Sequence, residues 1–217
     1  MPLSLRLQTI LNQALSGGDF WDLCCDHGLL GEHALYSKRF QKIHFVDQVP
    51  KIIDSLENRL KFYARNCSIH FHCMDASKIK KASGAIVIAG VGDKTMVQII
   101  EGILPSLQLP FSLTLCPHKN PHRVREYLIE KGFFLEQEEV VLERGHFREV
   151  LTVSKTPNKR SFDLLGVSLW AQGDGPKEQY AQHLWDHFTH LHPKSEDFHM
   201  GKKIRNHPSI RSLLGQK

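Results

Sequence analysis

The first two-thirds of the chain alternate short apolar runs with longer amphipathic stretches. The apolar runs are rich in β-branched and aromatic residues, as strands are. They occupy residues 20–26, 43–47, 68–75, 85–90 and 111–117. Helical spacing of apolar residues fills the gaps, most clearly at 49–66, 94–105 and 121–132. Apolar strands separated by helices predict a parallel sheet in a doubly wound α/β fold.

The pattern changes after residue 132. Two long strand-like segments follow, at 133–143 and 147–155, and Gly145 lies in the short connection between them. They predict a β-hairpin. Five parallel strands closed by a C-terminal hairpin is the architecture that we associate with Rossmann-like class I methyltransferases, an association that rests on fold alone.

Beyond residue 154 the pattern weakens. Residues 155–163 indicate a linker, 175–191 predict one amphipathic helix with Pro176 near its start, and 192–217 form a polar end without clear periodicity. We therefore expect a Rossmann-like methyltransferase domain at 1–154 and a basic, partly helical C-terminal extension at 155–217.

Composition narrows the class of protein. The chain has 217 residues, of which 41% are hydrophobic and 24% charged, as in a soluble globular protein. No window approaches the ~20 apolar residues of a membrane span, and the amphipathic N-terminus lacks a signal-peptide pattern. The five cysteines are odd in number and unevenly spaced, which favours reduced thiols in the cytoplasm. We expect a cytoplasmic protein, a monomer, with no membrane partner.

The formal charge of +5 is unevenly distributed. Residues 1–154 carry 18 Lys and Arg against 17 Asp and Glu, whereas 155–217 carry 10 against 6. The basic character therefore belongs to the extension, where it would suit a nucleic-acid backbone.

The predicted strands end in acids and glycines, and ligands of open α/β sheets bind beyond the carboxyl ends of the strands. These residues are Asp22 and Asp26, then Asp47, then Asp75, and finally the segment 89–93. In the first turn, Asp22 and Asp26 would repel a phosphate-bearing ligand. S-adenosylmethionine has no phosphate and carries a sulfonium and an ammonium, so an acidic turn suits it.

The spacing of the acids agrees with that ligand. Asp47 lies 19 residues after Gly28, where a carboxylate typically accepts the ribose hydroxyls of an adenosine ligand. Asp75 is placed to bind an adenine amine. A single Asp at a strand end is more often a turn former or a helix cap, but three at successive strand ends favour a binding site.

Several segments together resemble one family. They are "LSLRLQTI" (3–10), "DLCCDHGLLG" (22–31), "IVIAGVGDKTM" (86–96), "LTLCPHKNPHRVREYL" (113–128), "KGF" (131–133) and "EEVVLERGHFREVLTV" (138–153). In this order they are similar to the TrmK family, bacterial tRNA (adenine(22)-N1)-methyltransferases that use S-adenosylmethionine. The resemblance covers about 1–154 and implies that cofactor, with tRNA as the substrate.

Residue by residue, we expect two overlapping sets. The cofactor-binding set is Asp22, Cys24, Asp26, Gly28, Asp47, Gln48, Asp75, Ala76, Ala89, Gly90 and Gly92. The catalytic set is Asp26, His27, Asp93 and His118. Three positions depart from the family pattern: Cys24 replaces a Gly, Asp93 replaces part of a glycine pair, and His118 replaces an Asn. Cys24 places a side chain where backbone would otherwise approach the methionine moiety.

Methyl transfer to adenine N1 needs alignment more than proton removal, because the N1 lone pair is available at pH 7. The product is a cation. Asp26 is the first candidate to stabilise that charge and to take a proton from the exocyclic amine, with Asp93 second. His118 could stack on the base or hydrogen-bond to it. The structural alternatives are a helix cap for Asp26, with His27 as its surface partner, and a plain loop for His118.

The function predicted from the sequence is therefore S-adenosylmethionine-dependent N-methylation, with adenine N1 of tRNA as the target. The alternatives are a methyltransferase for a small molecule or another RNA, or a non-catalytic RNA- or nucleoside-binding relative. We expect no metal site. His183, His187 and His190 share one face of the expected C-terminal helix at metal-like spacing, but a histidine-rich surface is the simpler interpretation.

Overall fold

A computed structural model describes residues 2–63, 68–156, 163–166, 169, 176–191, 195 and 197–206. The strands are β1 (Asp19–Leu23), β2 (Lys42–Asp47), β3 (Ser68–Cys73), β4 (Ala82–Ala89), β5 (Leu107–Cys116), β6 (Phe134–Glu143) and β7 (His146–Ser154). The helices are α1 (Leu5–Gln13), α2 (Leu29–Ser37), α3 (Pro50–Leu60), α4 (Asp93–Ile103), α5 (Pro121–Glu130), α6 (Pro176–Thr189) and α7 (Phe198–Arg205), with short 3-10 helices η1 (Ala76–Lys78) and η2 (Leu104–Ser106).

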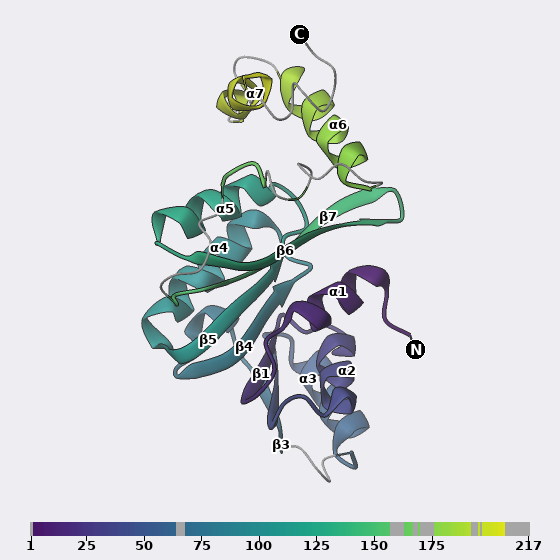
Figure 1. Ribbon diagram of the computed structural model, residues 1–217. Helices are drawn as coiled ribbons and strands as arrows, with labels where there is room; N and C mark the ends of the chain where they lie inside the picture. Colours follow the sequence, from purple (N-terminus) through teal and green to yellow (C-terminus); the bar gives the residue numbers. More distant parts are fainter. Residues whose placement is uncertain are drawn as a thin grey trace.

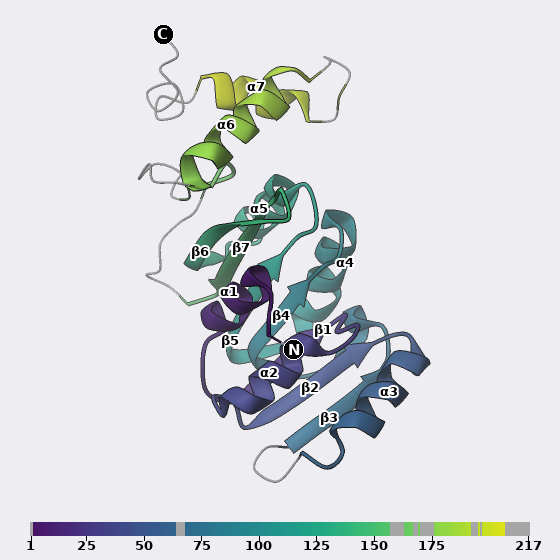
Figure 2. The ribbon, with the colours of Figure 1, turned by 90° about the vertical axis from the view of Figure 1, so that its right-hand side faces the viewer.

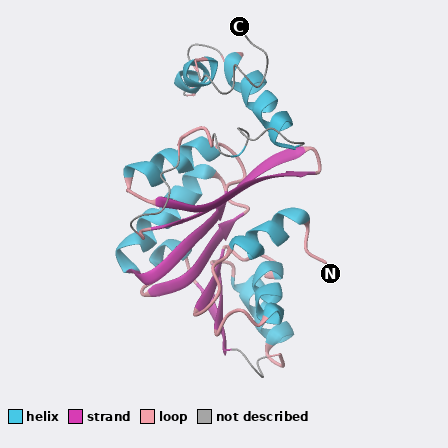
Figure 3. Cartoon of the chain, in the orientation of Figure 1, coloured by secondary structure: helices cyan, strands magenta, loops and turns pink. Residues whose placement is uncertain are grey.

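The strands lie side by side in one sheet (Figure 3). The sheet has seven strands in the order β3-β2-β1-β4-β5-β7-β6. All pairs from β3 to β5 are parallel, and β7 runs antiparallel to both β5 and β6. The predicted class is confirmed: five parallel strands are closed by a hairpin, as in class I methyltransferases.

Helices cover both faces of the sheet, α1, α2 and α3 on one side and α4 and α5 on the other (Figure 1). Successive strand residues point to opposite faces, so Phe20 packs into the cluster with α1 to α3 while Trp21 packs into the cluster with α4. Both faces are apolar, which explains the nearly continuous hydrophobic runs of the strands.

Most predicted boundaries agree with the structure within three residues. The first strand was expected to reach Asp26 and ends at Leu23, because Cys24 and Asp26 adopt positive φ angles of 58° and 48°, outside the β region. Two boundaries differ more. The strand expected at 111–117 begins at Leu107, and the helix expected at 49–66 ends at Leu60. Part of the remainder of that helix, residues 64–66, lies outside the described residues.

The described residues of the C-terminal part include two helices, α6 and α7, at the hairpin end of the sheet (Figure 2). The prediction of α6 is confirmed, whereas α7 was not expected in the polar end. The two helices share an apolar cluster with the hairpin, formed by Val140, Leu165, Leu169, Tyr180, Ala181, Leu184, Phe188, Met200 and Ile204. Most of the expected linker, 157–162, and the last residues, 207–217, lie outside the described residues. No helix in the described ranges is long and apolar enough to cross a membrane.

Candidate active site

A cavity of about 360 Å³ opens beyond the carboxyl ends of the parallel strands. We call it the cofactor cavity, after the ligand that the sequence predicts for these strand ends. Its lining residues are Cys24, Asp47, Gln48, Met74, Asp75, Ala76, Ser77, Val91, Thr95, Gln98 and Ile99. The volume falls in the range of ~300–1,000 Å³ typical of small-molecule sites. Among these described lining residues two are carboxylates and none is Lys or Arg. The cavity therefore suits a cationic ligand better than one that carries phosphates.

The turn after β1 folds back onto the end of β2. Cys24 and Asp26 take left-handed conformations, and Gly28, with a φ of 66°, precedes α2. A Cβ on Gly28 would lie 2.4 Å from a methyl group of Leu56, so packing against α3 excludes any larger residue there. The Cys24 side chain is half-buried and faces the cofactor cavity.

Asp47 anchors this turn. Its Oδ2 accepts the N–H of Asp26 at 3.2 Å, and its Oδ1 accepts the N–H of Val49 at 3.0 Å. These bonds fix the carboxylate at the rim of the cavity, and each oxygen keeps further acceptor capacity for a ligand hydroxyl.

Asp75 combines a helix cap with a place in the cavity wall. Its Oδ1 accepts the backbone N–H and the hydroxyl of Ser77, at 2.9 and 2.8 Å, at the start of η1. These hydrogen bonds lower the pKa of Asp75, which keeps it ionised. The cap and the ligand interpretations are thus compatible at this residue.

Asp22 lies in β1 and is 5% exposed, and it is not among the residues that line the cavity. Its Oδ2 accepts the N–H of Gly31 in α2 at 2.9 Å. Burial raises the pKa of Asp22 to about 7; the Gly31 hydrogen bond opposes this rise and the nearby Asp47 charge adds to it. A carboxyl group poised near neutral pH beside a ligand cavity is a common feature of functional sites.

The rest of the predicted cofactor set lies around the cavity without lining it. Gly90, with a φ of 77°, donates its N–H to Cys116 at 3.3 Å, and the neighbouring Val91 carbonyl accepts the N–H of His118 at 2.9 Å. These bonds tie the turn after β4, which follows Ala89 and includes Gly92, to the turn after β5.

The four predicted catalytic residues lie in three different places. The side chains of Asp26 and His27 are 70% and 81% exposed, and their Oδ2 and Nε2 atoms lie 3.8 Å apart at the surface of the first turn. Asp93 is 2% exposed in the first turn of α4. His118 is exposed and borders a different cavity, described below. The structure does not bring these four side chains together.

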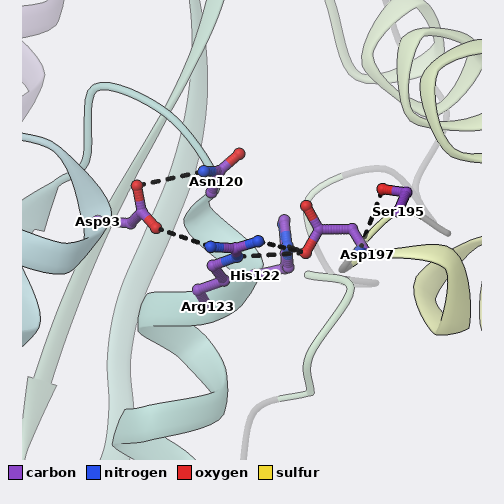
Figure 4. A network of polar contacts seen from close by, with 6 residues as sticks. All are labelled: Asp93, Asn120, His122, Arg123, Ser195 and Asp197. Carbon is purple, nitrogen blue, oxygen red and sulfur yellow. Dashed lines mark hydrogen bonds and ion pairs between the residues drawn. The ribbon is translucent and has the colours of Figure 1, made fainter. Parts of the chain in front are cut away.

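A polar network holds Asp93 and extends to the C-terminal helices (Figure 4). Asn120 Nδ2 donates to Asp93 Oδ1 at 3.2 Å, and Arg123 Nη1 lies 3.7 Å from Asp93 Oδ2. Arg123 also donates to Asp197 Oδ1 through Nη2 at 3.0 Å and Nε at 3.2 Å. His122 Nε2 lies 3.1 Å from the same oxygen. Arg123 therefore links the start of α4 to the residue that precedes α7.

Sequence reasoning missed part of the cavity wall. Thr95, Gln98 and Ile99 follow the turn after β4 at helical spacing, and that spacing puts them on one face of α4. The pattern could have indicated a shared face but not which ligand it meets. The pairing of Arg123 with Asp197 had no sequence signal, since 74 residues separate them.

The sheet order, the cavity at the strand ends and its acidic wall define a class I methyltransferase. The chain matches the family model described as "Methyltransferase domain" over residues 3–151, and it belongs to that family.

Individual relatives point to a particular kind of methyltransferase. The chain is 25% identical over 173 residues to the tRNA (adenine(22)-N(1))-methyltransferase of Bacillus subtilis, covering 79% of this chain and 72% of that protein. It resembles the crystal structure of B. subtilis TrmK with a TM-score of 0.70 and 19% identity, covering 98% and 99% of the two chains. It resembles the structure of M. capricolum TrmK in complex with S-adenosyl-homocysteine with a TM-score of 0.76 and 14% identity, covering 99% and 98% of the two chains. The resemblance to the TrmK enzymes is thereby confirmed.

Proposed function

We propose that this methyltransferase uses S-adenosylmethionine to methylate N1 of an adenine in tRNA. The observation that carries the proposal is the cofactor cavity: carboxylates from successive strand ends line it, without a lysine or arginine among its described lining residues. The same chain is similar to a tRNA (adenine(22)-N(1))-methyltransferase over most of its length.

The residues present fit the cofactor. When bound, S-adenosylmethionine supplies an electrophilic methyl group. Asp47 would accept the ribose hydroxyls, Asp75 would accept the adenine amine, and Gln48 and Ala76 complete that wall. Asp22 lies behind the first turn and would balance positive charge in the cavity. The Cys24 side chain narrows the cavity at the position where the TrmK family pattern has a glycine.

Methylation of adenine N1 requires three things of the protein: alignment of the base, stabilisation of the cationic product, and acceptance of a proton from the amine of that product. Asp26 carries the last two in this proposal, because its side chain is exposed on the turn whose backbone bonds to Asp47. The contacts of Asp93 with Asn120 and Arg123 favour a supporting role, in which it holds the turn after β4. His118 guides the base from the adjacent loop.

The extension is the RNA-binding part of the proposal. We assign residues 1–154 to catalysis and 155–217 to binding the tRNA backbone, since most of the net positive charge lies in the extension. We further propose a cytoplasmic monomer. The four described cysteines, Cys24, Cys25, Cys73 and Cys116, are free thiols, as is usual in a reducing compartment.

Incubation with labelled S-adenosylmethionine and unmodified tRNA, followed by nucleoside analysis, tests the function. The expected product is 1-methyladenosine, and Asp47→Ala should reduce its formation. If the protein binds the cofactor but methylates no tRNA, the substrate is a small molecule or another RNA. If it binds no cofactor, it is a non-catalytic relative.

A further inference from the structure

A second cavity, of about 220 Å³, lies where the loop after β5 meets the hairpin and the C-terminal helices. Its lining residues include Lys119, Phe147, Tyr180, His183, His187 and Phe188, together with His118 from the loop. This cavity shares no lining residue with the cofactor cavity. The hydrogen bond from His118 to Val91 joins the walls of the two.

The mouth of the second cavity carries rings and positive charge. Lys119, His118, His183 and His187 are exposed there. The rings of Phe147 and His183 have centroids 5.3 Å apart, and those of His183 and His187 are 6.3 Å apart with planes inclined by 17°. Such a row of flat rings is typical of sites that stack nucleobases.

The floor is apolar, with one satisfied polar pair. Leu184, Phe188, Met200 and Ile204 are buried there. The carboxylate of Glu149 also faces the cavity, but Arg125 Nε donates to it at 2.6 Å and the Tyr180 hydroxyl donates to its other oxygen. Both oxygens of Glu149 are therefore occupied by donors from the protein, and Lys119, exposed at the mouth, attracts an anionic ligand.

His183 suits a base better than a phosphate. Desolvation lowers the pKa of His183; His187 adds to this shift and Asp186 opposes it. Neutral imidazoles donate and accept hydrogen bonds, as the edges of bases require. The volume is below the ~300–1,000 Å³ of sites that enclose whole small molecules, so it is suited to one ring system.

We propose that this second cavity, the base cavity, binds one unstacked base of the RNA substrate, distinct from the base that is methylated. The inference rests on the proposed function. A base held between the ring row and the apolar floor would keep its phosphates at Lys119. Its separate position would fix the register of the RNA relative to the cofactor cavity, so the site contributes selectivity among RNA positions.

The test uses the full chain, saturated with S-adenosyl-homocysteine, and unmodified tRNA. His183→Leu removes a ring from the mouth, and His190→Leu is the matched control, because His190 is exposed just after α6 and lies outside the cavity. We expect His183→Leu to raise the Kd for tRNA about tenfold and His190→Leu to leave it unchanged. The slope of log affinity against log salt should stay the same, because no phosphate contact is lost. Affinity for S-adenosyl-homocysteine should not change.

A second measurement needs no variant. With the cofactor cavity filled by S-adenosyl-homocysteine, 5′-AMP is titrated into the wild-type protein and the ring protons of His183 and His187 are followed by NMR. A saturable shift of these protons, without one at His190, supports the base cavity. Normal tRNA affinity in His183→Leu, or no saturable shift at millimolar 5′-AMP, overturns it.

The two proposals fail separately. A wild-type protein that methylates tRNA while His183→Leu binds tRNA normally contradicts the base cavity alone. A wild-type protein that methylates no tRNA contradicts the proposed function, and the 5′-AMP titration still decides whether the cavity takes a base.

Discussion

The two cavities of this molecule are built in different ways. The cofactor cavity is formed by turns at one edge of a parallel sheet, and backbone N–H groups fix its key carboxylates. The base cavity is formed where helices from the end of the chain meet a loop and a hairpin, and side-chain pairs hold it together. A site of the first kind follows from sheet topology, whereas one of the second kind depends on particular pairings between distant segments.

Charge separates the cavities as well. The first has carboxylates and no described cation in its wall, and the second has exposed Lys119 and imidazoles at its mouth. A sulfonium cofactor and a phosphate-bearing RNA could thus be sorted by charge alone. Variants that act on one cavity and spare the other test this division.

The largest effect should come from Arg125, which supports the base cavity from beneath. It is fully buried and donates at 2.6 Å to both Glu138 and Glu149. Arg125→Met would leave two buried carboxylates without their partner and should lower the free energy of unfolding by about 3–5 kcal/mol in urea titrations. Arg144→Met, at the exposed hairpin turn, is the control and should change little. A loss below about 1 kcal/mol would mean that apolar packing alone holds the hairpin to the extension.

The next largest effect is expected from Asp47, in the cofactor cavity. Asp47→Ala removes a charged acceptor for the ribose hydroxyls and should cost about 1.5–3 kcal/mol of cofactor affinity, measured by calorimetry. Affinity for tRNA should not change, because Asp47 lies in the cofactor cavity alone. Asp54→Ala, exposed on α3, is the matched control. Equal cofactor affinity in the wild type and Asp47→Ala would remove Asp47 from the site.

The same contrast explains what the sequence could predict. Asp47 and Asp75 follow strands that the apolar pattern marks clearly, so their convergence needed only the rule for parallel sheets. Helix α7 was missed because, among its described residues, only two large apolar side chains, Met200 and Ile204, are buried, too few to mark a helix in a polar segment. That His118 and His183 line one cavity depends on how α6 docks on the hairpin, and no local pattern encodes that docking.

A stack of titratable histidine rings lies beneath the cofactor cavity. It should make the stability of that half of the molecule sensitive to acid. His44 lies between the rings of Trp21 and His70, at centroid distances of 3.7 and 4.7 Å, and its Nδ1 is 3.0 Å from His72 Nε2. Burial lowers the pKa of His44 to about 4, and the neighbouring His70 and His72 add to this shift. Asp19 opposes it, because its Oδ2 lies 3.4 Å from His44 Nε2. Lys42 pairs with the other oxygen of Asp19. Burial also lowers the pKa of His72.

The direction of this pH dependence follows from the number of protons that the folded and unfolded chains bind. Between pH 6.5 and about 4 the unfolded chain binds more protons than the folded one, so this stability is present at neutral pH and is lost as the pH falls. Asp22 acts in the opposite direction, because its folded pKa is raised. The wild type is therefore compared with His44→Phe, which keeps an aromatic ring at this position and removes the titratable group. From pH 7 to 4.5 the wild type should lose about 1–2 kcal/mol more than His44→Phe, and His190→Phe should behave as the wild type. Parallel pH curves for the wild type and His44→Phe would contradict this.

The smallest effect concerns the link between the cavities. Asp197 receives hydrogen bonds from Arg123, which also lies near Asp93 beside the cofactor cavity (Figure 4). Asp197→Asn keeps the shape but removes the charge of this partly exposed pair, so docking of α7 should weaken by about 0.5–1 kcal/mol. We expect the tRNA Kd to rise about threefold and cofactor affinity to stay unchanged, with the exposed Asp186→Asn on α6 as the control. Calorimetry of each ligand in the presence and absence of the other checks this. If Asp197→Asn altered cofactor affinity as well, Arg123 would couple the two cavities, and by linkage tRNA and cofactor would then change each other's affinity by one common factor.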